Sequence, residues 1–426
     1  MNKKLLITLS IAVFLIFGTL GAIRFAKGYR LNFKNKTVDG TGLLVTNSFP
    51  KGASVYINSK LTTATDDTLN LPPGEYEIKI VKDGFISWEK KLLLQEELVT
   101  QTNAHLFPAV PDLNALTSSG ATNLTPSPDG YKIAFSVASA SAKLKNGLWV
   151  LDLNSNSLSS SYGTRQISQE FGSIDFSKAD ILWSPDSQEI LVKNNGDTVL
   201  LDADRLNQPE SINDVLVRLS LILSEWEKEL AEKRQKQLSK LPEEMQKIAT
   251  QSAKNVYFSP DEEKLLYTAT ASALIKEDLI PSLPASNTQE EERNLQAGRI
   301  YVYDLKEDKN FFIAEAEKET AEETKLDKEE DEKAIINRRI KEIQRHYSPL
   351  YFQSLQWFPT SKHLVYNMKD KITILEYDNT NIATVYAGPF ENSFVYPWPD
   401  GSKLAILTTL TPEADQPLNL YAIDLK

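Results

Sequence analysis

Few residue types in this chain could perform covalent chemistry or bind a metal. The chain of 426 residues has no cysteine, which excludes thiol catalysis, thiolate metal ligands and disulfide bonds. Its three histidines, His105, His346 and His363, lie far apart in the sequence, and none has a second ligand at the spacing of known metal sites. We interpret each histidine as a surface or strand residue, not as a catalyst.

Sequence motifs of common catalytic sites do not occur in the chain. There is no Gly-x-Ser-x-Gly motif, which counts against a hydrolase of the prolyl-peptidase type. No glycine-rich phosphate loop occurs, and 17 glycines are few for this length. The net charge of −11 argues against a nucleic-acid partner, because binding to phosphates requires a basic face. We therefore expect no catalytic, cofactor-binding or metal-binding residues, and no enzyme.

The most regular set of reactive groups is a series of four aspartates. Asp129, Asp186, Asp261 and Asp400 each follow a proline. A ring of carboxylates could bind a metal ion, although nothing in the spacing indicates one. The Ser-Pro or Trp-Pro context provides a structural explanation, because an aspartate at this place bonds to the amides of its own turn. We interpret all four as turn residues, with a metal site as the alternative.

These aspartates belong to a pattern that occurs five times. Its turns lie at 127–130, 183–186, 258–261, 357–360 and 398–401. Proline presets φ at the second position of a β-turn, and Asp and Gly suit the third and fourth. Each turn precedes an apolar strand, and a second apolar strand ending in an acidic residue follows at 148–152, 198–202, 300–304, 372–376 and 420–424. A repeated turn-and-strand unit predicts a radial fold, a β-propeller.

The spacing of the copies predicts insertions. The turn prolines are 57, 75, 99 and 40 residues apart, whereas a four-stranded blade takes about 40–45 residues. Removing 212–252 shortens the second interval to 34, and removing 271–297 and 315–347 shortens the third to 39. We expect these insertions to be dispensable for the fold, so that replacing 315–345 by a short loop leaves the melting temperature nearly unchanged.

Two of the insertions have helical periodicity. Residues 212–252 carry apolar residues three and four apart, at Leu216, Leu219, Leu223, Trp226 and Leu230, and a second helix starts at Pro242. We interpret them as a helical hairpin on the propeller's flank, with a partner-docking arm as the alternative. Residues 315–333 hold ten acids against four lysines, which indicates a solvated or disordered run. Residues 334–345 are basic and amphipathic, and we expect them to pair with that run, with a membrane-surface role as the alternative.

Closure of the propeller requires one more strand. Five turn copies predict five blades, and the fifth lacks an outer strand because the sequence stops at 426. The segment 113–117 has the pattern of an outer strand and precedes the first blade. We expect it to pair beside 420–424, because an open apolar edge is an aggregation hazard. A sixth, diverged blade within 207–256 is the rival interpretation.

The first 30 residues have the composition of a membrane anchor. Residues 5–23 are uncharged, and 19 such residues can cross a bilayer. A cleaved signal peptide is the alternative. The basic residues after this segment outnumber Lys3 and Lys4 before it, which by charge counting favours a cytoplasmic body. A short lysine pair before a long apolar core is nevertheless the usual export signal, so we expect a single-pass anchor with an extracytoplasmic body.

The sequence pattern of residues 40–107 predicts a small β-rich domain. Charged residues alternate with Tyr76, Ile78 and Ile80, as in a half-buried strand. The turns at 50–53 and 73–76 and the Gly-Phe pair at 84–85 resemble the PEGA domain. The resemblance implies a β-sandwich of bacterial envelope proteins that is thought to mediate binding and has no catalytic residues. Prolines at 108 and 111 predict an extended link to the next domain.

Residues 113–426 resemble the TolB-like branch of WD-repeat-type propellers, in which a Trp-Ser-Pro-Asp-Gly turn opens each blade. The fourth copy departs from the pattern with Thr360 in place of Asp. We therefore expect a mainly β, membrane-anchored envelope protein without a cofactor, which binds a protein or a cell-wall or surface glycan. The alternative is a glycan-active enzyme built from propeller loops, for which paired carboxylates about 5–10 Å apart would be required.

Overall fold

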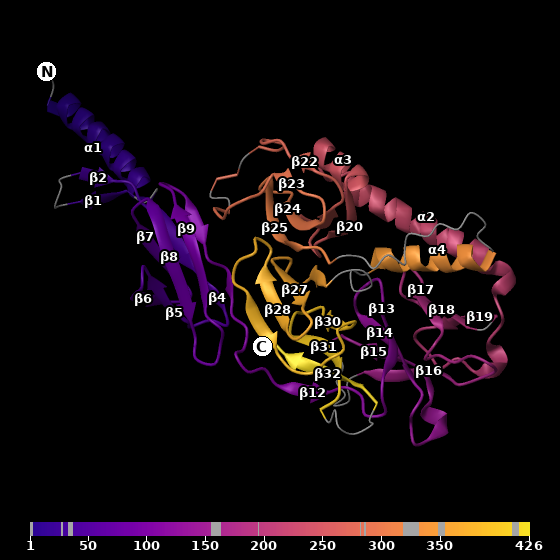
Figure 1. Ribbon diagram of the computed structural model, residues 1–426. Coiled ribbons are helices and arrows are strands. Elements are labelled where there is room, and N and C mark those ends of the chain that lie inside the picture. Colours follow the sequence, from indigo (N-terminus) through magenta and orange to yellow (C-terminus); the bar gives the residue numbers. More distant parts are fainter. Residues whose placement is uncertain are drawn as a thin grey trace. The chain divides into compact units, whose positions relative to one another are not determined.

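The computed structural model describes residues 3–26, 29–32, 37–154, 163–194, 196–281, 283–284, 287–317, 332–347, 354–410 and 417–426. The chain forms two compact units. Unit 1 comprises residues 1–108 together with 281–290, and unit 2 comprises 109–280 together with 291–426. Figure 1 shows the helix and the strands of unit 1 in indigo and purple, and the sheets of unit 2 from purple through magenta and orange to yellow.

Unit 1 begins with the predicted apolar helix, α1 (Lys3–Ala26). Its 19 residues Ile7–Phe25 have a mean hydropathy of 2.0, and none of them is buried in the protein. Among the described residues, α1 is the only helix long and apolar enough to cross a membrane. A membrane anchor and a signal peptide both satisfy this length and composition.

The remainder of unit 1 consists of short sheets. A hairpin pairs β1 (Arg30–Asn32) with β2 (Thr37–Asp39). A four-stranded sheet has the order β6 (Lys60–Ala64), β5 (Ser54–Ile57), β8 (Gly74–Val81), β9 (Trp88–Leu94). A second sheet has the order β10 (Val99–Gln101), β3 (Gly42–Thr46), β7 (Asp67–Leu71), and β11 (Ala104–His105) pairs with β4 (Ser48–Phe49). The alternation predicted for β8 is confirmed, since Ile78 and Ile80 are buried beside Val55, Trp88 and Leu44.

The described residues of unit 2 form five larger sheets, in which hydrogen-bonded neighbours run antiparallel. The first is β13 (Thr122–Pro126), β14 (Lys132–Val137), β15 (Gly147–Asp152) and β16 (Thr164–Gln169). The second is β17 (Asp180–Trp183), β18 (Glu189–Asn194) and β19 (Asp197–Asp202). The third is β20 (Ala253–Phe258), β21 (Lys264–Ala269), β24 (Arg299–Asp304) and β25 (Lys309–Glu315), and the fourth is β26 (Leu355–Trp357), β27 (His363–Asn367), β28 (Ile372–Glu376) and β29 (Ala383–Tyr386).

The fifth sheet joins the two ends of unit 2, as the sequence predicted. It has the order β12 (Leu113–Ala115), β32 (Asn419–Asp424), β31 (Lys403–Thr408), β30 (Val395–Pro397). Asn114 lies opposite Ala422 in an antiparallel ladder, and Leu116 N–H donates to Leu420 O at 2.8 Å. The expected pairing of 113–117 with 420–424 is therefore confirmed.

Neighbouring sheets pack through their apolar faces. The first sheet packs on the second through residues that include Val150, Ile167, Trp183 and Val192. Its other face packs on the fifth, through Phe135, Leu151, Trp398 and Leu407. The third packs on the fourth through Val302, Phe311, Leu364 and Leu375. Between the fourth and fifth, Gln356 Nε2 donates to Val395 O at 2.5 Å. The inner strands β14, β21, β28 and β31 are thus buried along nearly their whole length, which explains their nearly unbroken runs of hydrophobic residues.

Helices cover the remaining faces of the second and third sheets. The helices are α2 (Leu219–Leu238), α3 (Glu243–Gln251) and α4 (Glu332–Tyr347), and short 3₁₀ turns lie at Lys143–Lys145, Pro209–Ser211 and Leu216–Arg218. Apolar residues of α2 and α4 bury Leu182 and Leu191 of the second sheet. Residues of α3 pack on Leu265, Tyr267 and Tyr301 of the third, together with the small hairpin β22 (Ala273–Leu274) and β23 (Asn294–Leu295). Figure 1 shows α2 and α4 side by side between β17 and β20.

This packing corrects two expectations about the insertions. Two helices lie within 212–252 as predicted, but they do not form a hairpin: α2 packs beside α4 on the second sheet, and α3 packs on the third sheet. The apolar residues of α2, α3 and α4 form part of the core of unit 2. The expected dispensability of 315–345 is therefore wrong for α4, where Ile336, Ile340 and Ile343 are buried. Because this face of α4 is covered by protein, it does not support the membrane-surface alternative. Most of the acidic run, at 318–331, lies outside the described residues.

Candidate functional site

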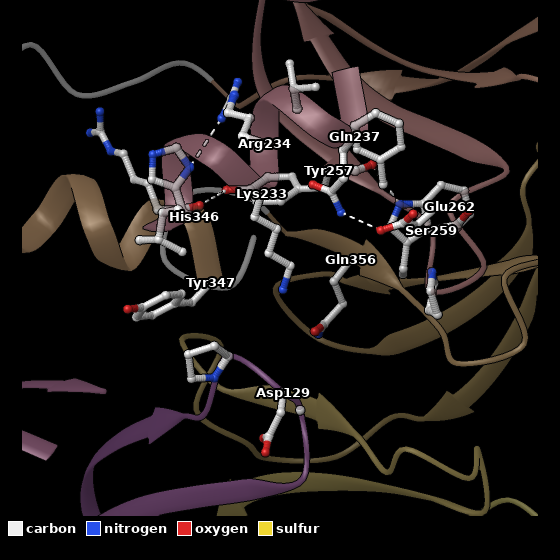
Figure 2. A pocket seen from close by; sticks show the side chains of 18 of the residues that line it. Asp129, Lys233, Arg234, Gln237, Tyr257, Ser259, Glu262, His346, Tyr347 and Gln356 are labelled. Atoms are coloured by element: carbon white, nitrogen blue, oxygen red, sulfur yellow. Dashed lines mark hydrogen bonds between the residues drawn. The ribbon is translucent and has the colours of Figure 1, made fainter. Parts of the chain in front are cut away.

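A cavity of about 900 Å³ lies in unit 2 where the repeated turns meet. Each of the five turns contributes a proline to its lining: Pro128, Pro185, Pro260, Pro359 and Pro399. The other lining residues come from α2, from α4 and from the strands β20, β26 and β30. Figure 2 shows this cavity with the helices above the turn that carries Asp129.

The turn aspartates have the structural role expected for them. In the first turn, Ser127 Oγ donates to Asp129 Oδ1 at 2.5 Å and Tyr131 N–H donates to the same oxygen at 3.0 Å. Asp186 and Asp261 accept equivalent bonds from their serine and from the amide two residues later. Asp400 accepts from Ser402 instead, through N–H at 2.9 Å and Oγ at 2.6 Å. Each carboxylate is thus engaged by its own turn, as such side chains commonly are.

The residue after the aspartate, or after Thr360 in the fourth turn, has a positive φ in all five turns. It is glycine in two of them, Gly130 (+80°) and Gly401 (+65°), and a larger residue in the others: Ser187 (+61°), Glu262 (+57°) and Ser361 (+58°). A left-handed conformation costs a non-glycine residue roughly 1 kcal/mol. Hydrogen bonds between neighbouring sheets explain the two serines. Ser187 Oγ accepts a bond at 3.1 Å from the amide of Asp129, and Ser361 Oγ accepts one at 3.1 Å from the amide of Asp261.

Tryptophans before two of the turns connect adjacent sheets. Trp183 is fully buried, and its Nε1 donates to Thr125 O at 2.9 Å. Trp357 Nε1 donates to Tyr257 O at 3.0 Å in the same way. A buried indole needs such a partner for its N–H. These bonds fix the inner strands around the cavity.

The C-terminal end of α4 connects the inner strands of the second and third sheets. Gln344 Nε2 donates to Ile181 O at 3.0 Å, and Tyr347 OH donates to Trp183 O at 2.9 Å. On the other side, Tyr257 OH donates to Arg345 O at 3.0 Å. Burial raises the pKa of Tyr257 well above its usual value, so the phenol keeps the proton that it donates.

The wall formed by α2 and α4 carries cationic side chains. Arg234 Nη1 lies 3.3 Å from His346 Nδ1, and because arginine can only donate, the imidazole accepts through Nδ1. Desolvation and the nearby Arg234 charge lower the pKa of His346, which keeps the ring neutral near pH 7. Desolvation also lowers the pKa of Arg234. In Figure 2, Lys233 points from α2 into the space that Tyr347, Gln356 and Asp129 surround.

A carboxylate at the edge of the cavity connects α2 to the third turn. Glu262 accepts from Gln237 Nε2 at 2.9 Å and forms an ion pair with Lys240. The hydrogen bond from Lys240, followed by that from Gln237, lowers the pKa of Glu262. A general acid in a glycosidase needs the opposite shift. The role of Glu262 is therefore structural, because it holds the end of α2 against the third turn.

The structure does not bring the three histidines together. In unit 1, His105 has its ring centroid 5.1 Å from that of Phe49 and 4.7 Å from that of Phe107. His363 is buried in the fourth sheet, where its Nδ1 lies 2.8 Å from Thr360 Oγ1. Only His346 lines the cavity, and its pairing with Arg234 could not be foreseen from a position 112 residues away. Among the described residues, no group of three or more His, Asp or Glu could hold a metal ion.

Comparisons with known proteins identify the smaller domain. Residues 41–109 match the family described as PEGA domain, which confirms the resemblance predicted for that segment. No curated protein sequence matches the chain. Similar solved structures include TolB and WD-repeat β-propellers, as the turn sequences predicted.

The likeness to these structures is distant. The putative TolB from Agrobacterium tumefaciens is 11% identical, with 74% of this chain and 77% of that chain covered and a TM-score of 0.22. TolB from Acinetobacter baumannii is 11% identical, with 82% and 60% covered and a TM-score of 0.20. The Cps50 (Swd1) β-propeller domain from Myceliophteria thermophila is 10% identical, with 74% and 99% covered and a TM-score of 0.25. Scores this low say nothing about a shared ligand or partner.

Proposed function

We propose that this protein is a non-catalytic, membrane-anchored protein of the cell envelope that binds a partner protein in the cavity of unit 2. One observation carries the proposal: residues of all five repeated turns converge on a single cavity of about 900 Å³. A cavity of this size that combines apolar and polar side chains can serve as a binding site. Prolines and aromatic residues such as Tyr131, Trp357 and Tyr396 form much of its wall.

The architecture that we propose for unit 2 is a five-bladed propeller. Its support is the circular order of contacts, from the fifth sheet to the first, second, helices, third, fourth and back to the fifth. In this arrangement α2, α3 and α4 take the place between the second and third sheets that a further blade would occupy. The sixth-blade interpretation of 207–256 finds no support, since this region contains the helices α2 and α3 between 219 and 251, and its last residues belong to β20 of the third sheet.

A binding role suits the chemistry of the cavity better than catalysis. Among the described residues, four carboxylates line it: Asp129, Glu229, Glu262 and Glu342. Asp129 is engaged by its own turn and Glu262 by Lys240 and Gln237. Hydrolysis of a glycan requires one carboxylate as a proton donor with a raised pKa, and the pKa of Glu262 is lowered.

Photocrosslinking in cells tests the binding role. We expect that the full-length protein with a benzophenone amino acid in place of Tyr131, which lines the cavity, forms a covalent adduct with one discrete partner on illumination. The matched control carries the same group in place of Leu144, which is 71% exposed and lies in the 3₁₀ turn Lys143–Lys145, outside the cavity. Mass spectrometry identifies the partner. Adducts of the same identity from both positions, or none from position 131, would contradict a partner in the cavity.

The proposed extracytoplasmic topology can be tested with a single cysteine, because the natural chain has none. We expect Leu144→Cys to react with a membrane-impermeant maleimide on intact spheroplasts, because a short lysine pair before a long apolar core is the usual pattern of an export signal. Detection of the intact N-terminus on the labelled protein would identify α1 as an uncleaved anchor. Labelling that appears only after lysis would place the body in the cytoplasm, in agreement with the flanking charges.

A further inference from the structure

The α2–α4 wall of the cavity contains a cationic corner, formed by Lys233 and Arg234, with the neutral ring of His346 beside Arg234. Arg234 has five N–H donors, and the hydrogen-bond partner found for it among the described residues is His346 Nδ1 at 3.3 Å. Among these residues, no carboxylate forms an ion pair with Lys233 or Arg234. Desolvation lowers the pKa of Arg234, as expected for a cation that has lost water without gaining an anion.

A second arginine at the same pair of helices, Arg339, differs from Arg234 because its guanidinium is paired with a carboxylate. On α4, Arg339 holds Glu227 of α2 through Nε at 2.7 Å and Nη2 at 2.8 Å. This fork already joins the two helices by charge, and the buried isoleucines of α4 join them by apolar contact. Arg234 is therefore not required as an ion-pairing residue between α2 and α4, and its donors remain for a ligand.

The cavity beyond this corner indicates the kind of anion. The corner opens into a space of about 900 Å³ whose wall contains the five turn prolines and the aromatic side chains of Tyr347, Trp357 and Tyr396. A free phosphate or sulfate would use only the corner and leave these apolar walls exposed. An extended peptide can place a carboxylate against Arg234 while its other side chains contact the prolines and aromatics.

We propose that the cationic corner binds a carboxylate of an acidic segment of the partner protein. This inference rests on the proposed binding role of the cavity and adds the chemistry of the segment that enters it. Arg234 holds the carboxylate in a two-pronged bond, and Lys233 adds a second positive charge. His346 accepts a bond from Arg234 and orients its guanidinium, so it is a positioning residue.

Binding of model peptides to the full-length protein in detergent micelles tests this inference. The probes are a fluorescein-labelled oligo-glutamate and an oligo-glutamine of the same length, followed by fluorescence anisotropy. The protein has a net charge of −11, so general attraction to a polyanion is not expected. We expect oligo-glutamate to bind, oligo-glutamine to bind much more weakly, and Arg234→Gln to weaken the binding of oligo-glutamate about tenfold or more.

The matched control is Lys228→Gln, which removes a positive charge from an exposed position of α2 that does not line the cavity. It should leave the affinity unchanged. If Arg234→Gln does not fold, as judged by its melting curve, Lys233→Gln replaces it, because Lys233 is exposed and has no ion pair among the described residues.

Three results would overturn the inference: equal affinity of both peptides, equal weakening by Lys228→Gln, or no weakening by the variants of the corner. Complete displacement of oligo-glutamate by millimolar inorganic phosphate would instead identify a small-anion site. In each of these cases, an adduct from position 131 in the crosslinking experiment would leave the proposed binding role intact. Absence of the adduct from position 131 would contradict the proposed function itself.

Discussion

Replacing Ile340 by aspartate should unfold unit 2, although the residue belongs to an insertion in the repeat. Ile340 is 2% exposed and packs with Leu223 and Trp226 of α2 and Leu191 of the second sheet. Truncation to alanine at such a site costs about 2–5 kcal/mol of unfolding free energy. An unpaired carboxylate adds the cost of its desolvation, so we expect at least about 4 kcal/mol for Ile340→Asp.

The control for this prediction lies on the same helix. Ile335 is 39% exposed, and aspartate in the first turn of a helix interacts favourably with the helix dipole. We expect Ile335→Asp to change the unfolding free energy by less than about 0.5 kcal/mol. Urea unfolding of the full-length protein in micelles, followed by tryptophan fluorescence, measures both variants. Similar stability of the two would mean that α4 covers no essential core.

Removal of the Trp183 side chain should be the most damaging change in the repeated unit itself. The indole is fully buried between the first and second sheets, and its N–H bonds to Thr125 O. We expect Trp183→Ala to cost about 3–5 kcal/mol of unfolding free energy, because it leaves a large cavity. Trp183→Phe keeps most of the apolar contact but removes the donor, and should cost less.

Trp149 provides the matched comparison for Trp183. Its Nε1 also donates to a backbone oxygen, that of Lys145, at 2.9 Å, but the side chain is only partly buried. Both variants lose one tryptophan and one hydrogen bond, so the difference between them reports burial between the sheets. Urea unfolding measures this difference by circular dichroism. A loss from Trp149→Ala as large as that from Trp183→Ala would contradict the role of Trp183 in joining the sheets.

The proposed binding cavity has two parts, the repeated turns and the helical wall, and only the first was predictable from the sequence. The five turns that line the cavity were predicted from the sequence, because their prolines and aspartates act on atoms within a few residues. Its helical wall was not predicted. The sequence placed the insertions outside the repeat, whereas α2 supplies Lys233 and Arg234 to the cavity and α4 supplies His346. The proposed partner specificity therefore depends on the insertions rather than on the repeat.

Local chemistry explains how much of the fold the sequence determined by itself. Turn residues, the alternation along β8 and the apolar spacing of α2 depend on neighbours within about one helical turn or two strand residues, so each was correctly predicted. The pairing of 113–117 with 420–424 was predicted because only one strand-like segment remained for an otherwise open edge. The PEGA segment was identified by its turn motifs.

Only the tertiary structure decided which surfaces the amphipathic helices cover. A spacing of three and four residues reveals that a helix has an apolar face, but hydrophobic attraction is non-directional and does not specify the partner of that face. The bond between Arg234 and His346 and the fork between Arg339 and Glu227 each join residues 112 positions apart. No local pattern encodes such contacts. They exist because α2 and α4, from two separate insertions, bury their apolar faces together on the second sheet.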